Sequence, residues 1–174
     1  SKLNKDHGGP QGSLYTFLNK IAKQFPKKQL CTLAYLHTYN PPINLKIASN
    51  ITTLFCPIEM DRGNPISLKN NNKPVANALA RWQSASKNLF VWDYTVQFAN
   101  YMSPFPNLSY FEENYTTFKA NNVKGLFVQG YADVPGDFSE LRQYLLAKLL
   151  WDASIDVKAT TADFLRGFYG KAAS

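Results

Sequence analysis

Apolar positions along this chain follow two patterns, a helical one and a continuous one. The segment 13–25 repeats apolar residues at the helical spacing, with Ser13 in position to cap it and Pro26 in position to end it. Its apolar face comprises Leu14, Phe17, Leu18, Ile21, Ala22 and Phe25. The run QLCTLAYL at 29–36 follows without a period, which is typical of a strand buried on both faces.

Three further apolar runs have the same strand-like character. They are ITTLFCPI at 51–58, LFVWDYT at 89–95 and VKGLFVQG at 123–130. The first crossover, 39–50, contains two prolines and no helical period, so we expect it to be irregular. The stretches 75–88 and 108–122 are helical in character and lead into the third and fourth strands.

Two helices are expected after the fourth strand. Asp137 and Glu140 have the spacing of a capping box, and the helix FSELRQYLLAKLLWD follows. The apolar face of this helix includes Phe138, Leu141, Leu145 and Leu149. The last helix is predicted from about Val157 to Tyr169 and ends at Gly170.

Continuous apolar strands that alternate with helices predict an α/β fold with a parallel sheet covered on both faces. Four such units make the C-terminal half of a (β/α)8 TIM-type barrel or a small doubly wound sheet. The length of 174 residues, with 45% hydrophobic residues, fits a single domain that spans 1–174. The chain opens on SKLNKDHGGPQGS, which resembles an internal loop, so we expect a fragment of a larger protein.

Charge and cysteine content exclude several classes of function. The formal charge is +7, but the lysines are scattered and no nucleic-acid reading motif is present, so a solvated basic surface is favoured over a nucleic-acid partner. No glycine-rich phosphate loop follows any strand, and no metal-ligand spacing occurs, so no cofactor or metal is expected. Cys31 and Cys56 are interpreted as two buried thiols on neighbouring strands, with a disulfide as the alternative. No signal peptide or membrane-length apolar span is present.

Polar and aromatic residues gather where each predicted strand ends. In parallel α/β folds the functional residues lie at the carboxyl ends of the strands. Carboxylates beside aromatic rings suit a sugar, whose apolar ring faces stack on the aromatic side chains while the acids accept from its hydroxyls. Glu59 is the best candidate acid, because a glycosidase must protonate the leaving oxygen. The strand-end residues are Tyr35, His37, Tyr39, Glu59, Asp61, Arg62, Trp92, Asp93, Tyr94, Gln129 and Tyr131.

Each of these residues also has a purely structural interpretation. Glu59 and Asp61 can be loop carboxylates, one of them paired with Arg62. Asp93 can serve as a structural hydrogen-bonding group, since it lies inside the sequence VWDY. No GxSxG nucleophile elbow exists to partner a histidine base. Core or lining roles stay open for His37, Trp92 and Tyr94.

The order and spacing of several segments also resemble a known family. They are TLAYLHTYNPP, LFCPIEMDRGNPI, LFVWDYTVQFANYMSPFPNL, VKGLFVQGY, ELRQYLLAKLLWD and FLRGFYG. This series, which covers nearly the whole chain, resembles the carboxyl-terminal part of domain-of-unknown-function family 4838 (DUF4838). Some members of that family are classed as glycoside hydrolase family 163.

The resemblance implies a bacterial (β/α)8 barrel that acts on complex glycans. Characterised relatives are endo-acting β-N-acetylglucosaminidases on N-glycans that use the substrate's own acetamido group as nucleophile. The match to PIEMDR implies catalytic roles for Glu59 and Asp61, with Arg62 nearby, and the match to WDY implies a substrate-binding role for Trp92 and its neighbours. The resemblance also implies a periplasmic or cell-surface location.

Two hypotheses follow from this resemblance. The first is a truncated glycoside hydrolase that is inactive as an isolated fragment. In this hypothesis Gln29–Leu36 forms an open edge of the sheet, and a missing N-terminal half of the barrel or another chain completes the fold there. The second is a non-catalytic glycan-binding or scaffolding barrel. The second is favoured by Val128, because the family pattern has a glutamate before the QG of the fourth strand.

Overall fold

The computed structural model describes residues 1–131 and 135–173 and has an α/β architecture. One sheet contains four parallel strands in the spatial order β1-β2-β3-β4. The strands are β1 (Leu30–Ala34), β2 (Ile51–Phe55), β3 (Asn88–Tyr94) and β4 (Gly125–Gln129). Sequential parallel strands with intervening crossovers are the arrangement of half a β/α barrel, which confirms the predicted fold class.

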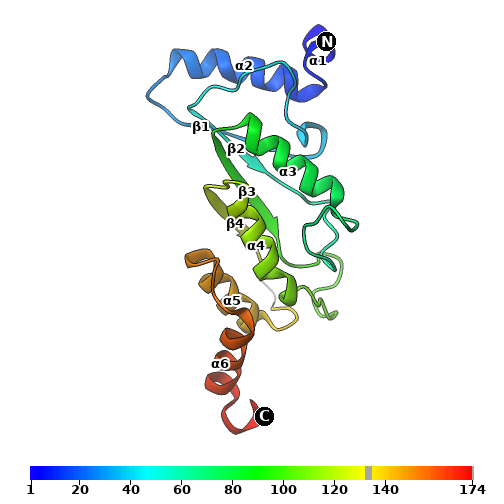
Figure 1. Ribbon diagram of the computed structural model, residues 1–174, viewed down its shortest axis with the longest axis vertical. Helices are drawn as coiled ribbons and strands as arrows, with labels where there is room; N and C mark the ends of the chain where they lie inside the picture. The colour runs from blue at the N-terminus through cyan, green and yellow to red at the C-terminus, as the bar shows by residue number, and fades with distance from the viewer. Residues whose placement is uncertain (132–134, 174) are drawn as a thin grey trace.

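Helices flank this sheet and extend beyond it. Figure 1 shows α3 and α4 lying across the same face of the sheet, with α5 and α6 leading away from it to the C-terminus. None of the helices in the described ranges is long and apolar enough to cross a membrane. The helices are α1 (Lys2–Asp6), α2 (Pro10–Gln24), α3 (Lys73–Ala85), α4 (Phe111–Ala120), α5 (Ser139–Trp151) and α6 (Val157–Tyr169), with the 3-10 turns η1 (Leu36–Thr38), η2 (Leu108–Tyr110) and η3 (Gly170–Ala173).

The hydrophobic core lies between the sheet and the helices. Every second residue of β2, beginning with Ile51, is completely buried against them. On the helix side the fully buried residues include Tyr15, Leu79 and Trp82. The Tyr15 hydroxyl shares a hydrogen bond of 2.8 Å with Thr53 Oγ1, which satisfies both buried hydroxyls and ties α2 to the sheet.

The other face of the sheet is partly open, which differs from the prediction that both faces are covered. Leu33 on β1 is 41% exposed and Phe127 on β4 is 51% exposed. Cys31 is also exposed, so the prediction of two buried thiols is wrong for it, and both cysteines are free rather than joined in a disulfide. As expected, β1 forms an open edge of the sheet.

Two helix starts differ from the prediction, and other residues than those predicted occupy their N-cap positions. Helix α2 begins at Pro10 instead of Ser13, since proline lacks the N–H that a first helical position leaves unpaired. The capping box before α5 is absent: Phe138 occupies the N-cap position in the left-handed region, and the Asp137 carboxylate instead accepts from the Phe105 N–H at 3.0 Å. Helix α6 ends at Gly170 as predicted.

The apolar faces were predicted less well than the elements. Phe17 and Phe25 of the first helical pattern are exposed, as is Phe138 before α5. Tyr15 occupies the core position instead, because its hydroxyl finds a partner there. The opening segment, expected as a loop, contains the short helix α1. The first crossover, 39–50, follows the turn η1 and contains no helix or strand, as predicted.

Candidate functional site

A cavity of about 390 Å³ lies on the open face of the sheet, at the carboxyl ends of the strands. Alternation along β3 directs Trp92 and Tyr94 to this face, since residues two apart in a strand share a side. The predicted strand-end residues Tyr35 and Gln129 also line it. The rest of the lining is formed by Leu33, Cys56, Ile58 and Phe98.

Aromatic contacts hold the wall of this cavity in place. The rings of Trp92 and Tyr94 are stacked with centroids 6.3 Å apart, and Trp92 meets Phe127 edge-on at 4.5 Å. Trp92 Nε1 donates to Gln129 Oε1 at 3.0 Å, which links β3 to β4 across the cavity wall. An aromatic side chain fixed in this way is a preorganised surface for the apolar face of a sugar ring.

Cys56 and Tyr94, two residues of the cavity lining, are neutral at physiological pH. Burial raises the pKa of the Cys56 thiol to about 11 and that of the Tyr94 hydroxyl to about 12. The remaining lining side chains that carry hydrogen-bonding groups are Tyr35, Trp92 and Gln129. An uncharged cavity with aromatic walls and a few polar groups suits a neutral, hydroxylated ligand.

Glu59 is an exposed carboxylate on the loop that follows β2. Within the described residues its side chain makes no hydrogen bond or ion pair, so its oxygens are available to a ligand. The neighbouring Tyr39 has its pKa raised to about 12, first by burial and then by the charge of Glu59. Glu59 is not among the residues that line the cavity.

Asp61, in contrast, is engaged within its own loop. Its carboxylate accepts from Asn64 Nδ2 and the Gly63 N–H, both at 2.9 Å, and from Asn71 Nδ2 at 3.2 Å. These hydrogen bonds, with Asn64 first, lower the pKa of Asp61. Asp61 therefore acts as a hydrogen-bond acceptor that stabilises the turn of its own loop.

Arg62 directs its guanidinium to the protein backbone. Its Nε donates to the Tyr94 carbonyl, and its Nη1 donates to the carbonyls of Ile58 at 3.0 Å and Met60 at 2.8 Å. Nη2 donates to the Pro57 carbonyl at 3.4 Å. Arg62 is not among the residues that line the cavity.

Asp93 points to the helix-covered face of the sheet, away from the cavity. It is 3% exposed, and its carboxylate accepts from the Tyr94 N–H at 2.8 Å. Burial raises the pKa of Asp93, against the opposing effect of the Arg62 charge. Val128 pairs in register with Asp93 and packs against the same core, so the Val128 position does not border the cavity either.

Three other predicted residues lie near the carboxyl edge but outside the cavity lining. His37 is exposed within η1. The ring of Tyr39 packs on Phe55 with centroids 4.9 Å apart, on the helix side of the sheet. Tyr131 follows β4 and meets Tyr101 edge-on at 5.1 Å. The structure thus brings together Tyr35, Trp92, Tyr94 and Gln129 and separates the others from this group.

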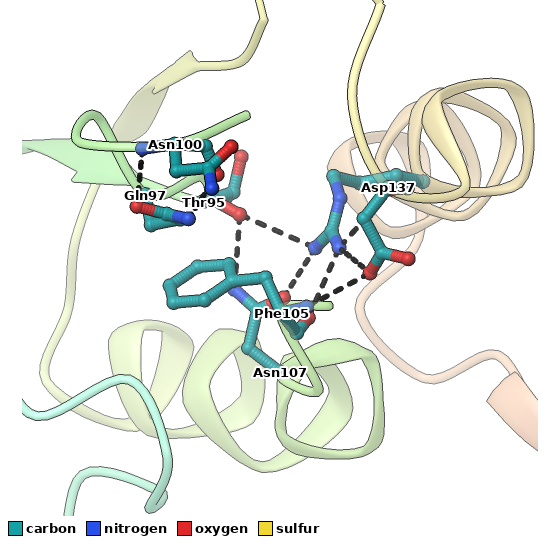
Figure 2. A network of polar contacts seen from close by, with 7 residues as sticks. Thr95, Gln97, Asn100, Phe105, Asn107 and Asp137 are labelled. Carbon is teal, nitrogen blue, oxygen red and sulfur yellow. Dashed lines mark hydrogen bonds and ion pairs between the residues drawn. The ribbon is translucent and has the colours of Figure 1, made fainter. Parts of the chain in front are cut away.

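Arg142 on α5 was missed by the sequence analysis and supports the loops beside the site. It is 1% exposed, although it carries a charge. Its guanidinium donates to Thr95, Phe105, Asn107 and Asp137, which Figure 2 shows close together. The sequence feature that could have identified it is an arginine on the apolar face of α5, three and four residues before Leu145 and Leu146.

The described residues contain no group of three His, Cys, Asp or Glu side chains that could hold a metal ion. Comparison with curated proteins found no match, and comparison with solved structures found none either. A family model described as Domain of unknown function (DUF4838) matches residues 1–174. The chain therefore belongs to the DUF4838 family.

Proposed function

We propose that this domain supplies part of the substrate cleft of a glycoside hydrolase that acts on complex glycans containing N-acetylglucosamine. The observation that carries the proposal is the neutral aromatic cavity around Trp92, at the same sheet edge as the free carboxylate of Glu59. The resemblance to glycoside hydrolase family 163 supports the choice of substrate. On this proposal the protein acts in the periplasm or at the cell surface.

In the proposed reaction Glu59 protonates the leaving glycosidic oxygen. The substrate's own acetamido oxygen attacks the anomeric carbon as the bond to the leaving group breaks, which gives a cyclic oxazolinium intermediate. The Glu59 carboxylate then takes a proton from water, and this water opens the ring at the same carbon. A second carboxylate must orient the acetamide, and Asp61 is the candidate from the sequence.

The engagement of Asp61 in its own loop favours a further source for that second carboxylate. Its two oxygens already accept three hydrogen bonds from this loop. A carboxylate has about four acceptor sites, so Asp61 keeps only about one for an acetamide. We therefore propose that a carboxylate from another part of the complete cleft shares this role.

The open face of the sheet supports the proposal that more β/α units complete the fold. Parallel sheets are found with both faces covered, yet Leu33 and Phe127 are exposed here. Both β1 and β4 also end the sheet with unpaired edges. Strands supplied by a longer protein or by another chain would pair with these edges and close a barrel. The isolated 174-residue protein is then expected to be inactive.

A non-catalytic glycan-binding domain is the second candidate. It is favoured by the state of the other two carboxylates at this edge, because Asp61 is hydrogen-bonded within its own loop and Asp93 is buried on the helix side of the sheet. Such a domain would hold a glycan against Trp92 without cleaving it. Glu59→Gln would then leave binding unchanged, whereas Trp92→Ala would weaken it.

The test is to incubate the intact protein that contains this domain with N-glycans and aryl N-acetylglucosaminides, and to identify products by mass spectrometry. We expect cleavage that leaves one N-acetylglucosamine on the acceptor, and Glu59→Gln should lower turnover by about a hundredfold or more. Glu113→Gln, an exposed position on α4, is the matched control. Retention of a glycan without cleavage would favour the binding domain, and neither binding nor cleavage would refute both.

A further inference from the structure

Two arginines lie beside the cavity without lining it, and both direct their side chains to loop backbone. Arg62 follows β2, and Arg142 is on the first turns of α5. Together they contact the loop after β2, the end of β3, the loop after β3 and the segment before α5. These segments carry several of the residues that surround the cavity.

Arg62 fastens the loop that bears Glu59 to the end of β3. Its donors reach the carbonyls of Ile58 and Met60, which flank Glu59, at 3.0 and 2.8 Å. Its Nε bonds the Tyr94 carbonyl, and its guanidinium lies 5.3 Å from the centre of the Tyr94 ring. One side chain therefore sets the position of the acid relative to the aromatic wall.

Arg142 fastens the loop after β3, which carries Phe98 of the cavity lining. Its Nη1 donates to the Thr95 carbonyl at 3.2 Å and also to Asn107 Oδ1. Nη2 donates to the Phe105 carbonyl at 3.1 Å and lies 3.5 Å from Asp137 Oδ2. Figure 2 shows that these partners approach the guanidinium from separate segments of the chain.

The planar guanidinium explains why arginine serves at both positions. It presents five N–H donors in a fixed fork, whereas a lysine ammonium is a single donor centre. Burial lowers the pKa of both arginines. The negative charge of the buried Asp93 partly compensates the positive charge of Arg62, and the negative charge of Asp137 does the same for Arg142.

We propose that Arg62 and Arg142 are positioning residues that hold the Glu59 loop and the Phe98 loop in fixed places around the cavity. Only the choice of a glycan as the ligand rests on the proposed function. An arginine that recognised a ligand would keep donors free toward the cavity. In Arg62 all three nitrogens already donate to carbonyls. Arg142 is almost completely enclosed by the protein.

The test compares Arg62→Lys and Arg142→Lys in the intact protein, with Arg166→Lys as the matched control. Arg166 lies on α6, and within the described residues its side chain makes an exposed ion pair with Asp163 and no other polar contact. Hydrogen exchange followed by mass spectrometry reports loop order without any ligand. We expect faster exchange at 57–61 in the first variant and at 95–107 in the second, with β2 unchanged in both.

Glycan affinity is the second readout, measured by calorimetry with a neutral N-glycan. We expect each of the two lysine variants to bind at least about tenfold more weakly, because displaced loops misplace the binding groups, while Arg166→Lys binds as the wild type does. Weaker binding with wild-type exchange would mean that the arginine contacts the ligand, and it would overturn the proposal. Wild-type exchange in both lysine variants would overturn it as well.

Two outcomes require a further variant or a separate interpretation: failure of Arg142→Lys to fold, and absence of glycan binding by the wild type. If Arg142→Lys fails to fold, Asp137→Asn keeps the arginine and removes its partly exposed acidic partner, and the same region at 95–107 should exchange faster. Unchanged exchange in that variant would count against the proposal. If the wild type binds no glycan, the proposed function fails, and the exchange data still decide whether the arginines order the loops.

Discussion

Replacing Trp92 by alanine removes the largest aromatic surface of the cavity. Trp92 is half-buried, with one part of its ring packed on Phe127 and Tyr94 and its Nε1 bonded to Gln129. The ring therefore has a defined orientation before any ligand arrives. A glycan that enters the cavity covers the part of the ring that remains exposed.

The expected loss of affinity follows from that exposed area. An aromatic side chain buries about 150–250 Å² when fully covered, and the protein already covers most of Trp92, so covering the rest removes about 50–80 Å² from water. At about 25 cal/mol per Å² this contributes about 1.3–2 kcal/mol, which is about 8- to 30-fold in Kd. Trp92→Phe keeps a ring but loses the bond to Gln129, so a smaller loss of about fivefold is expected.

Isothermal titration of an N-glycan into wild type, Trp92→Ala and Trp92→Phe measures these differences. Trp151→Ala is the matched control, since Trp151 is 92% exposed at the end of α5 and lies outside the cavity lining. Affinity should be highest for wild type and Trp151→Ala, lower for Trp92→Phe and lowest for Trp92→Ala. It would be refuted if Trp92→Ala bound within about twofold of the wild type, a difference smaller than burial of the ring allows.

Three other predictions concern the fold. Cys31 is exposed, whereas Cys56 is buried with its pKa raised to about 11, so iodoacetamide at pH 8 should alkylate Cys31 alone; equal labelling in a peptide map would contradict this. Trp82→Phe should lower the free energy of unfolding by about 1–3 kcal/mol, because it removes a buried Nε1 donor and leaves the Tyr39 carbonyl unpaired; an unchanged urea midpoint would refute it. Burial raises the pKa of Asp93, so its ionisation destabilises the folded protein as pH rises above about 4. The stability of the wild type relative to Asp93→Asn should therefore be greater near pH 4 than near pH 7. A difference in urea midpoints that stays constant with pH would contradict this.

The elements of the fold were predictable because apolar periodicity records local structure directly. All four strands and the helices 73–85, 111–120 and 157–169 overlap the predicted segments, with shifts of a few residues at their ends. The order of elements then restricted the topology to a parallel sheet. Side-chain burial was less predictable, since Phe17 fits the helical period as well as any core residue and is nevertheless exposed.

The candidate site was predictable only in part, because chain position near a strand end does not fix which face a side chain occupies. Trp92 and Asp93 are adjacent in sequence, yet alternation sends one to the cavity and the other to the helix side. Arg62 could be placed near the edge from sequence, but its bond to the Tyr94 carbonyl depends on the tertiary approach of two strand ends, whereas its other three carbonyl partners lie in its own loop. The same is true of Arg142, whose partners lie 35 and 47 residues away along the chain.

The central claim is that the cavity at the carboxyl edge of the sheet binds a carbohydrate. The chain contains three tryptophans, Trp82 in the core, Trp92 at the cavity and Trp151 on the surface. A titration of an N-glycan into ¹⁵N-labelled protein, followed through the three indole N–H resonances, tests the claim directly. The Trp92 resonance should shift in proportion to occupancy while those of Trp82 and Trp151 stay in place. Saturable binding that leaves the Trp92 resonance unmoved, or no binding at all, would contradict the claim.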